Sequence, residues 1–376
     1  MNSSEKLLQV ETNLEAMKLP NFYIQEERGA TLVSILLKAY NSNWGEHKNE
    51  LSNEVENFFK QNPLDEKSIK FLEEKDIDEE MLYNIALTYG HLEREVGLFD
   101  FIRKNKDYRE DLKKLRDNLI IILQRIEGIL PDQLKEKLDE FITDDIEKRE
   151  QSIQEVQERI KKLIDFFNVV PQTTRVTKIV LLPTDFMYSK ESGRAFQFGD
   201  ELILYSHIDN PSNLEHEFLH SVINPIVDKL SEKLSEEQKQ KIRKSGSYRL
   251  KVEESYGEGF YSLLCEEFIR TYNDVIQRDE KPMTYEDFFQ KISTLDEKKF
   301  EELIRKNEIF KRRCKELEVG SLEELQNKSQ VYFDKFERNE LRVLIYSFYE
   351  KYIQRKEKDD KVIFEDFVLS EFEKGI

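Results

Sequence analysis

The residues of this 376-residue chain best suited to chemistry form the pentad His216-Glu217-Phe218-Leu219-His220. On a helix, side chains four residues apart lie on the same face, so His216 and His220 can both present an imidazole nitrogen to one metal ion. Glu217 follows the first histidine, where its carboxylate can reach a water on the metal rather than the metal itself. The chain has five histidines, and two of them fall in this pentad. The pattern is typical of zinc-dependent hydrolases, with Glu217 as the general base.

The sequence around the pentad predicts a short helix with an apolar back. Leu214, Phe218 and Val222 recur at i, i+4 spacing and are expected to pack toward a core. Ser212 opens a capping box at the N-terminal end, and Pro225 is expected to stop or kink the helix. The alternative is an ordinary amphipathic helix whose two histidines meet solvent or pack in the core.

A catalytic zinc ion usually takes three protein ligands and leaves a fourth position for water. An extended H-E-x-x-H-x-x-G-x-x-H site is excluded, because Ile223 and Ile226 occupy the positions that need Gly and His. The better candidates are the adjacent acids Glu266 and Glu267, in a segment (260–276) with the apolar periodicity of a helix. Periodicity alone does not choose between the two glutamates.

The chain resembles the gluzincins, the thermolysin-like zinc peptidases whose third ligand is a glutamate on a downstream helix. It is most similar to an uncharacterised bacterial domain family with a His-Glu-Phe-x-His-Ser-x-x-Asn-Pro stretch followed by Glu-x-Leu-Val-Arg-Ala. This chain has His-Glu-Phe-Leu-His-Ser-Val-Ile-Asn-Pro at 216–225 and Glu-Glu-Phe-Ile-Arg-Thr at 266–271. The resemblance implies peptide hydrolysis and places the third ligand on Glu266. Arg270 stands where thermolysin-like enzymes have Asp, and at i+4 it could hold the Glu266 carboxylate in place.

Hydrolysis through a tetrahedral intermediate also needs a hydrogen-bond donor for the developing oxyanion. Tyr256, Tyr261 and Tyr272 stand close to the proposed ligand in the sequence. We name Tyr256 first, because a tyrosine in a glycine-flanked loop can swing over a substrate carbonyl. Packing is the alternative role for each of the three.

A small sheet is predicted before the pentad. Val176–Leu182 is rich in β-branched residues and indicates a buried strand. Ala195–Phe198 and Glu201–Ser206 flank Gly199-Asp200 and predict a hairpin. In zinc peptidases of this class, an edge strand just before the metal helix pairs with an extended peptide. Ile203–Ser206 would be that strand, and a plain structural hairpin is the alternative.

Most of the remaining chain has helical periodicity, as in Ala30–Tyr40 and in Tyr108–Phe167, which predicts paired antiparallel helices interrupted at Gly128 and Pro131. The predicted fold class is α+β and predominantly helical, with a small zincin-like sheet and the active-site helix embedded in a large helical surround. The predicted regions are a helical N-terminal region (1–168), a zincin-like core (169–284) and a helical C-terminal region (285–376).

Composition limits the partners and the compartment. The chain has 59 basic and 77 acidic residues, and its net charge of −18 argues against binding a nucleic-acid backbone. The sequence shows no export signal and no apolar run long enough to cross a bilayer, so we expect a cytoplasmic protein that is not inserted in a membrane. Two cysteines, Cys265 and Cys314, fit a reducing compartment. A Cys265 thiolate ligand is one alternative, and a small buried residue is the other.

The sequence therefore predicts a cytoplasmic zinc metallopeptidase acting on peptides or proteins. His216, His220 and Glu266 would bind Zn²⁺, Glu217 would be the general base, and Tyr256 would stabilise the oxyanion. A catalytically silent zinc-binding scaffold is the alternative from another class, and zinc-dependent hydrolysis of a non-peptide amide is a third. The sequence says nothing about oligomeric state.

Overall fold

The computed structural model describes residues 20–40, 49–73, 79–89, 106–169, 176–182, 193–206, 211–246, 259–278 and 281–372. The contacts divide the chain into two units. Unit 1 comprises Met1–Phe166 and Thr174–Ser221, and unit 2 comprises Phe167–Thr173 and Val222–Ile376. The second boundary falls after Ser221, inside one continuous helix, so that helix belongs to both units.

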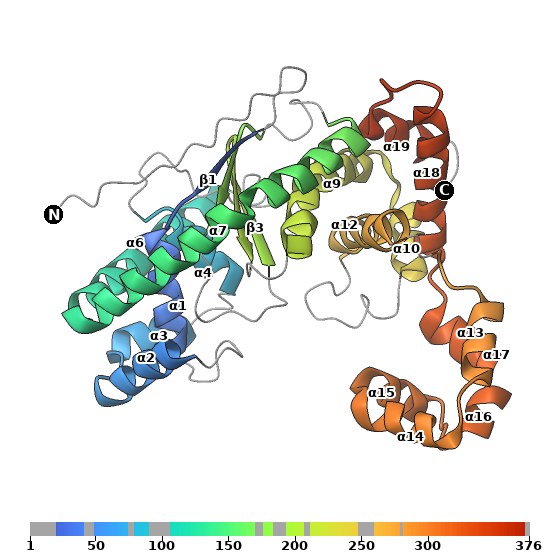
Figure 1. The fold of residues 1–376 in the computed structure, drawn as a ribbon, viewed down its shortest axis with the longest axis horizontal. Helices are drawn as coiled ribbons and strands as arrows, with labels where there is room; N and C mark the ends of the chain where they lie inside the picture. The colour runs from blue at the N-terminus through green and yellow to red at the C-terminus, as the bar shows by residue number, and fades with distance from the viewer. Residues whose placement is uncertain are drawn as a thin grey trace. The chain divides into compact units, whose positions relative to one another are not determined.

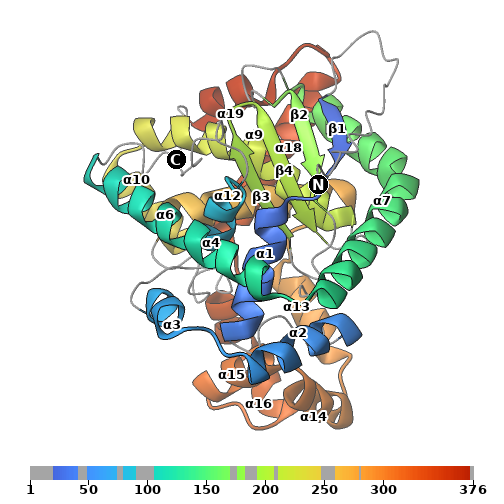
Figure 2. The same ribbon diagram turned by 90° about the vertical axis from the view of Figure 1, so that its left-hand side faces the viewer.

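Unit 1 contains a four-stranded mixed sheet in the order β1-β2-β4-β3 (Figure 2). β1 pairs with β2 and β2 with β4 in parallel, whereas β3 pairs with β4 in antiparallel fashion. A small sheet within a mostly helical chain confirms the predicted α+β class. The strands are β1 (Asn21–Ile24), β2 (Lys178–Leu181), β3 (Gly193–Phe198) and β4 (Glu201–Ser206).

The predicted hairpin is present as β3 and β4, and Gly199 in its turn adopts a φ of 62°, which favours glycine. The predicted edge position of Ile203–Ser206 is wrong, because β4 lies between β2 and β3. Hairpin pairing is local and visible in the sequence. The parallel pairing of β4 with β2 joins separate segments and leaves no such signal. Among the described strands, β3 is the edge next to β4.

β1 is a strand that the sequence analysis does not predict, within a region expected to be helical. It has four residues, too few to show a clear period of two. Its register pairs Asn21 with Lys178, so the crossover between the two parallel strands contains most of the helices of unit 1. Such a long crossover is what parallel pairing requires.

The core of unit 1 gathers around α1, on which Leu32, Val33, Ile35 and Leu36 are fully buried. Gly29 permits a close approach to α4, since a Cβ there would lie 1.8 Å from the Ala86 carbonyl oxygen. The helices are α1 (Arg28–Tyr40), α2 (Glu50–Gln61), α3 (Glu66–Glu73), α4 (Glu79–Ala86), α6 (Lys106–Ile129) and α7 (Asp132–Phe167).

The two predicted long helices are α6 and α7, and the break falls at Leu130-Pro131. Gly128 lies inside α6 rather than at an interruption. Figure 2 shows the two helices diverging from the turn that joins them, so the predicted antiparallel pairing is wrong. Each helix buries its apolar residues against other parts of unit 1, as Leu123 on α6 and Leu138 on α7 do.

Unit 2 has an aromatic core around α12 (Phe260–Thr271), α18 (Glu340–Lys356) and α19 (Phe364–Phe372). Tyr349 on α18 stacks on Phe364 with ring centroids 5.2 Å apart, and its hydroxyl donates to the Phe268 carbonyl oxygen at 3.1 Å. α12 continues into a π-helix, η1 (Tyr272–Gln277), and α10 (Glu236–Ser245) packs on α12.

A second cluster of unit 2 gathers helices between residues 285 and 337, drawn in orange in Figure 1. Its centre is Tyr332, whose ring stacks on Phe288 at 5.4 Å. The elements are α13 (Tyr285–Ser293), α14 (Glu297–Lys306), α15 (Glu308–Glu316), α16 (Leu322–Asn327), α17 (Ser329–Tyr332) and a second π-helix, η2 (Phe333–Glu337). Among the described residues, no helix combines the length and apolar character needed to cross a membrane.

Candidate metal centre

The pentad lies on α9 (Pro211–Lys233), which is longer than predicted. The helix begins at Pro211, a favourable first residue because its φ is preset and it needs no hydrogen-bond acceptor. Ser212 therefore lies in the first turn and not at the cap. The predicted stop at Pro225 is also wrong, because the helix continues to Lys233. Burial of Ile226 and Val227 beyond the proline offsets the one backbone hydrogen bond that proline removes.

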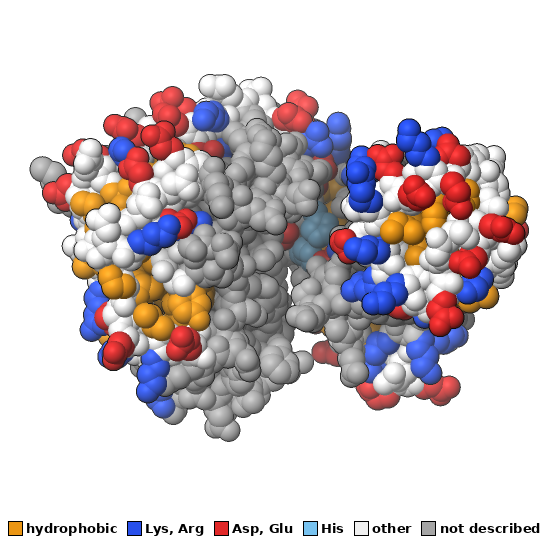
Figure 3. Space-filling view, turned by 90° about the horizontal axis from the view of Figure 1, so that it is seen from below, with side chains coloured by type: hydrophobic (Ala, Val, Ile, Leu, Met, Phe, Trp, Pro, Cys, Tyr) orange, Lys and Arg blue, Asp and Glu red, His pale blue; other side chains and the backbone are white. Residues whose placement is uncertain are grey.

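The apolar back of α9 forms as predicted, since Leu214, Phe218 and Val222 are each at most 3% exposed. In unit 1, Arg159 of α7 donates to the buried carboxylate of Glu215 at 3.3 Å and anchors the first turns of α9. His216, Glu217 and His220 are half-buried on the other side of the helix. The pale-blue surface in Figure 3 belongs to these two histidines, the only ones among the described residues.

Within unit 2, α12 lies against the second half of α9. The Tyr261 hydroxyl donates to the Asn224 carbonyl oxygen at 3.3 Å. Asn224 is one turn beyond His220 on α9, and Glu266 is little more than one turn beyond Tyr261 on α12. The predicted helix that carries the two acids is present as α12. Its apolar stripe is buried at Phe260, Leu264 and Phe268.

His216, His220 and Glu266 each offer a ligand atom, and these three atoms all lie within 4.8 Å of one another. The imidazole rings are 5.1 Å apart between centroids and inclined at 74°. Two imidazoles and one carboxylate are the donor set of a catalytic zinc site with a position left for water. Among the described residues this is the group suited to hold a metal ion.

Glu266 is held from its own helix, as the spacing predicts. The Arg270 Nε donates to Glu266 Oε2 at 3.0 Å, and the Glu266 side chain is 5% exposed. A carboxylate this deeply buried needs a charged or hydrogen-bonding partner to remain ionised. Arg270 provides that partner and also fixes the direction of the carboxylate, as groups behind metal ligands do.

Glu267 has a different environment although it is the next residue. It is 1% exposed, and its Oε1 accepts a hydrogen bond from Asn339 Nδ2 at 2.8 Å. The structure therefore separates the two glutamates that periodicity could not. Sequence reasoning missed Asn339, because it stands 72 residues away and no spacing rule connects the two.

The other candidates near the site are placed as follows. Cys265 is 2% exposed, burial raises the pKa of its thiol well above the usual value, and its sulfur is not among the clustered ligand atoms, which fits a small buried residue. Tyr272 is buried with its ring 5.0 Å from that of Phe167, so its role is packing. Tyr256 lies outside the described residues, and its proposed role stays a prediction.

Comparison with known proteins found no relative of this chain. Neither the family models nor the curated proteins nor the solved structures that were compared with the chain match it. The class of the candidate site therefore depends on the motif, the local geometry and the resemblance described above.

Proposed function

We propose that this protein is a zinc-dependent metallopeptidase, with His216, His220 and Glu266 as the metal ligands and Glu217 as the general base. One observation carries the proposal. The two histidines of the pentad and the glutamate of a distant helix bring their ligand atoms within 4.8 Å of one another. Glu217 stands beside the first of these ligands on the same helix.

The residues fit the chemistry that the proposal needs. Zinc held by this donor set would lower the pKa of a water molecule and polarise a substrate carbonyl. Two neutral imidazoles and one carboxylate leave one positive charge on such a site. The ion pair with Arg270 engages Glu266 Oε2 and orients the carboxylate that the proposal assigns to the metal.

Glu217 would move the protons. Its carboxylate is half-buried and would accept the proton of the attacking water and then donate it to the nitrogen of the departing amine. A base that shuttles a proton in this way needs access to the substrate, which a fully buried residue lacks.

β3 supports a peptide as the substrate. Since β4 is paired on both sides, the edge strand next to it is β3, which pairs with β4 alone among the described strands. The outer backbone groups of an edge strand can pair with an extended chain. We place substrate recognition on β3 in place of Ile203–Ser206.

The experiment is Glu217→Gln, assayed for bound zinc by mass spectrometry and for cleavage of a peptide library. We expect about one zinc per chain to remain and turnover to fall by about 10²- to 10⁴-fold, the usual contribution of general acid–base catalysis. Glu232→Gln removes the same charge from an exposed position on α9 and should change neither quantity.

Unchanged turnover in the Glu217 variant would contradict the mechanism. A wild-type protein that binds zinc but cleaves no member of the library would favour the silent scaffold instead.

A further inference from the structure

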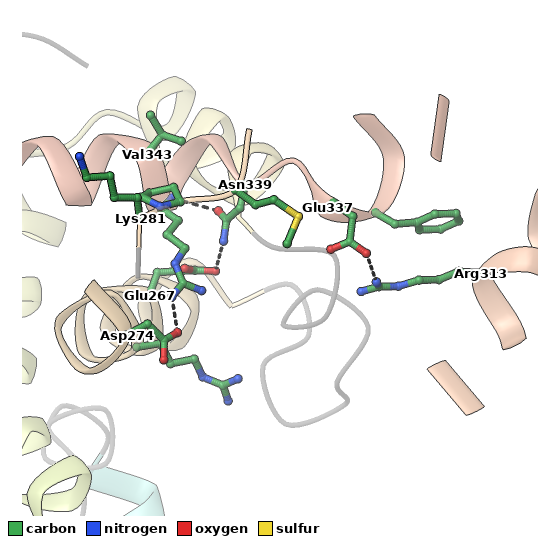
Figure 4. A pocket seen from close by; sticks show the side chains of 12 residues that line it. Glu267, Asp274, Lys281, Arg313, Glu337, Asn339 and Val343 are labelled. Carbon is green, nitrogen blue, oxygen red and sulfur yellow. Dashed lines mark hydrogen bonds and ion pairs between the residues drawn. The ribbon is translucent and has the colours of Figure 1, made fainter. Parts of the chain in front are cut away.

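Unit 2 contains a cavity of about 340 Å³ on the side of α12 that carries Glu267 (Figure 4). Its walls come from α12, η1, residues 281–283, α15, η2 and the start of α18. In Figure 4, Glu267 and Asn339 face each other across a hydrogen bond, and Arg313 and Glu337 form an ion pair at the other end. The cavity shares Arg270 with the candidate metal centre, but no proposed metal ligand or general base lines it.

The lining of the cavity carries more cationic than acidic side chains. The cavity is lined by four cationic side chains and three acidic ones, although the whole chain has a net charge of −18. Each acid already has a partner: Asn339 donates to Glu267, Arg342 pairs with Asp274, and Arg313 pairs with Glu337. The cations are Arg270, Lys281, Arg313 and Arg342. Arg270, Arg313 and Arg342 each pair with a carboxylate, so binding of an anion would depend on Lys281 and on the remaining donors of Arg342.

Two of these cations keep donors for a ligand. Lys281 is exposed and makes no ion pair or hydrogen bond within the described part of the chain. Arg342 uses Nη2 for its ion pair with Asp274, and a guanidinium has five N–H donors in total. A carboxylate or a phosphate group could therefore accept hydrogen bonds from both without breaking the existing pair.

The cavity also has apolar side chains that are accessible. Met283 is 38% exposed and Val343 is 53% exposed, and both line the cavity with Pro282 and Phe336. Exposed apolar side chains beside charged donors are typical of small-molecule sites, where apolar walls bury the body of the ligand and a few polar groups orient it.

Two π-helices shape the cavity. Asp274 comes from η1, and Phe336 and Glu337 come from η2. π-helical residues make up well under 1% of residues in proteins, and such segments occur frequently at functional sites. The widened turn changes the direction of the side chains that follow it, so both π-helices direct residues into one cavity. The presence of two π-helices at one cavity is a second observation, separate from the charges, that points to a functional site.

We propose that this cavity binds a small organic anion that joins a carboxylate or phosphate head to a short apolar body. The head would contact Lys281 and Arg342, and the body would lie against Met283 and Val343. The proposal is independent of the metallopeptidase function.

The test measures binding of three probes with the same six-carbon body, hexanoate, hexyl phosphate and hexanol, by calorimetry at constant ionic strength. We expect the probe with the preferred head to bind at least about fivefold more tightly than hexanol. Lys281→Gln should weaken that binding about fivefold, as expected when one exposed ionic contact is lost. Val343→Glu, which brings a negative charge to an exposed position of the wall, should weaken it further.

Lys358→Gln is the matched control, since Lys358 is an exposed lysine of unit 2 that does not line the cavity. It should leave binding unchanged. Stronger binding of hexanoate identifies a carboxylate ligand, and stronger binding of hexyl phosphate identifies a phosphate ligand. Equal binding of hexanol and both anions, or anion binding that survives Lys281→Gln and Val343→Glu, would overturn the proposal.

Discussion

The two sides of α12 give consecutive glutamates different environments. Glu266 is held by Arg270 and lies with its ligand atom among those of the two histidines, whereas Glu267 is held by Asn339 and lines the cavity of unit 2. Both are almost completely buried. The residue type and the burial are therefore the same, and only the neighbours differ.

The two buried carboxylates differ in where their partners come from. Arg270 comes from the same helix, so its pairing with Glu266 follows from helical geometry. Asn339 comes from the start of α18, where its side-chain oxygen also accepts a hydrogen bond from the Arg342 backbone N–H. Glu267 is thus fixed by a tertiary contact. The difference between the two glutamates can be tested by substituting each glutamate, or its partner, separately.

The largest effect is expected from the glutamates themselves. Glu266→Gln keeps the shape but removes a ligand charge, and zinc affinity should fall by more than the roughly 10- to 100-fold typical of residues behind the ligands. Glu267→Gln can still accept the hydrogen bond of Asn339 and should leave zinc binding unchanged. Competition with a chromophoric chelator measures both constants. Loss of zinc in the Glu267 variant alone would reverse the assignment.

A smaller effect is expected at Arg270. Arg270→Gln removes the ion pair that orients Glu266, so zinc affinity should fall by about 10- to 100-fold while the helix stays folded. Arg270→Lys keeps the charge and should recover part of the loss. Arg278→Gln is the control, because Arg278 pairs with Asp274 and is mostly exposed. Wild-type zinc affinity in Arg270→Gln would show that the pair has no positioning role.

The smallest effect concerns the aromatic core that supports α12. Burial raises the pKa of Tyr349 well above its ordinary value of 10, so the folded state favours the neutral phenol. The unfolded chain releases this proton near pH 10. The stability from the neutral phenol is therefore present below pH 10 and is lost as pH rises above it, by up to about 1.4 kcal/mol per pH unit.

Tyr349→Phe removes both the titrating group and the hydrogen bond to the Phe268 carbonyl oxygen. Urea unfolding at pH 8 should show a loss of about 1 kcal/mol. Between pH 10 and 11 the variant should lose less stability than the wild type. Equal slopes in wild type and Tyr349→Phe would show that this phenol does not limit alkaline stability.

Several features were predictable from the sequence because they depend on neighbours within about one helical or hairpin turn. The pentad places His216 and His220 on one face, and the i+4 spacing predicts the pair of Glu266 and Arg270, which the structure contains. The hairpin around Gly199 likewise follows from local turn chemistry. Local rules also predict the break between α6 and α7 at Pro131.

The tertiary structure decided the features that depend on residues far apart in the chain. β1 and the interior position of β4 arise from parallel pairings across long crossovers, which leave no local pattern. The separation of Glu266 from Glu267 depends on Asn339, and the cavity depends on two π-helices from different parts of the sequence. Continuation of α9 beyond Pro225 likewise reflects burial of Ile226 and Val227, because packing energy outweighs a local helix-breaking preference. The sequence by itself thus determined the chemistry that each short segment can offer, and tertiary packing decided which of those groups meet.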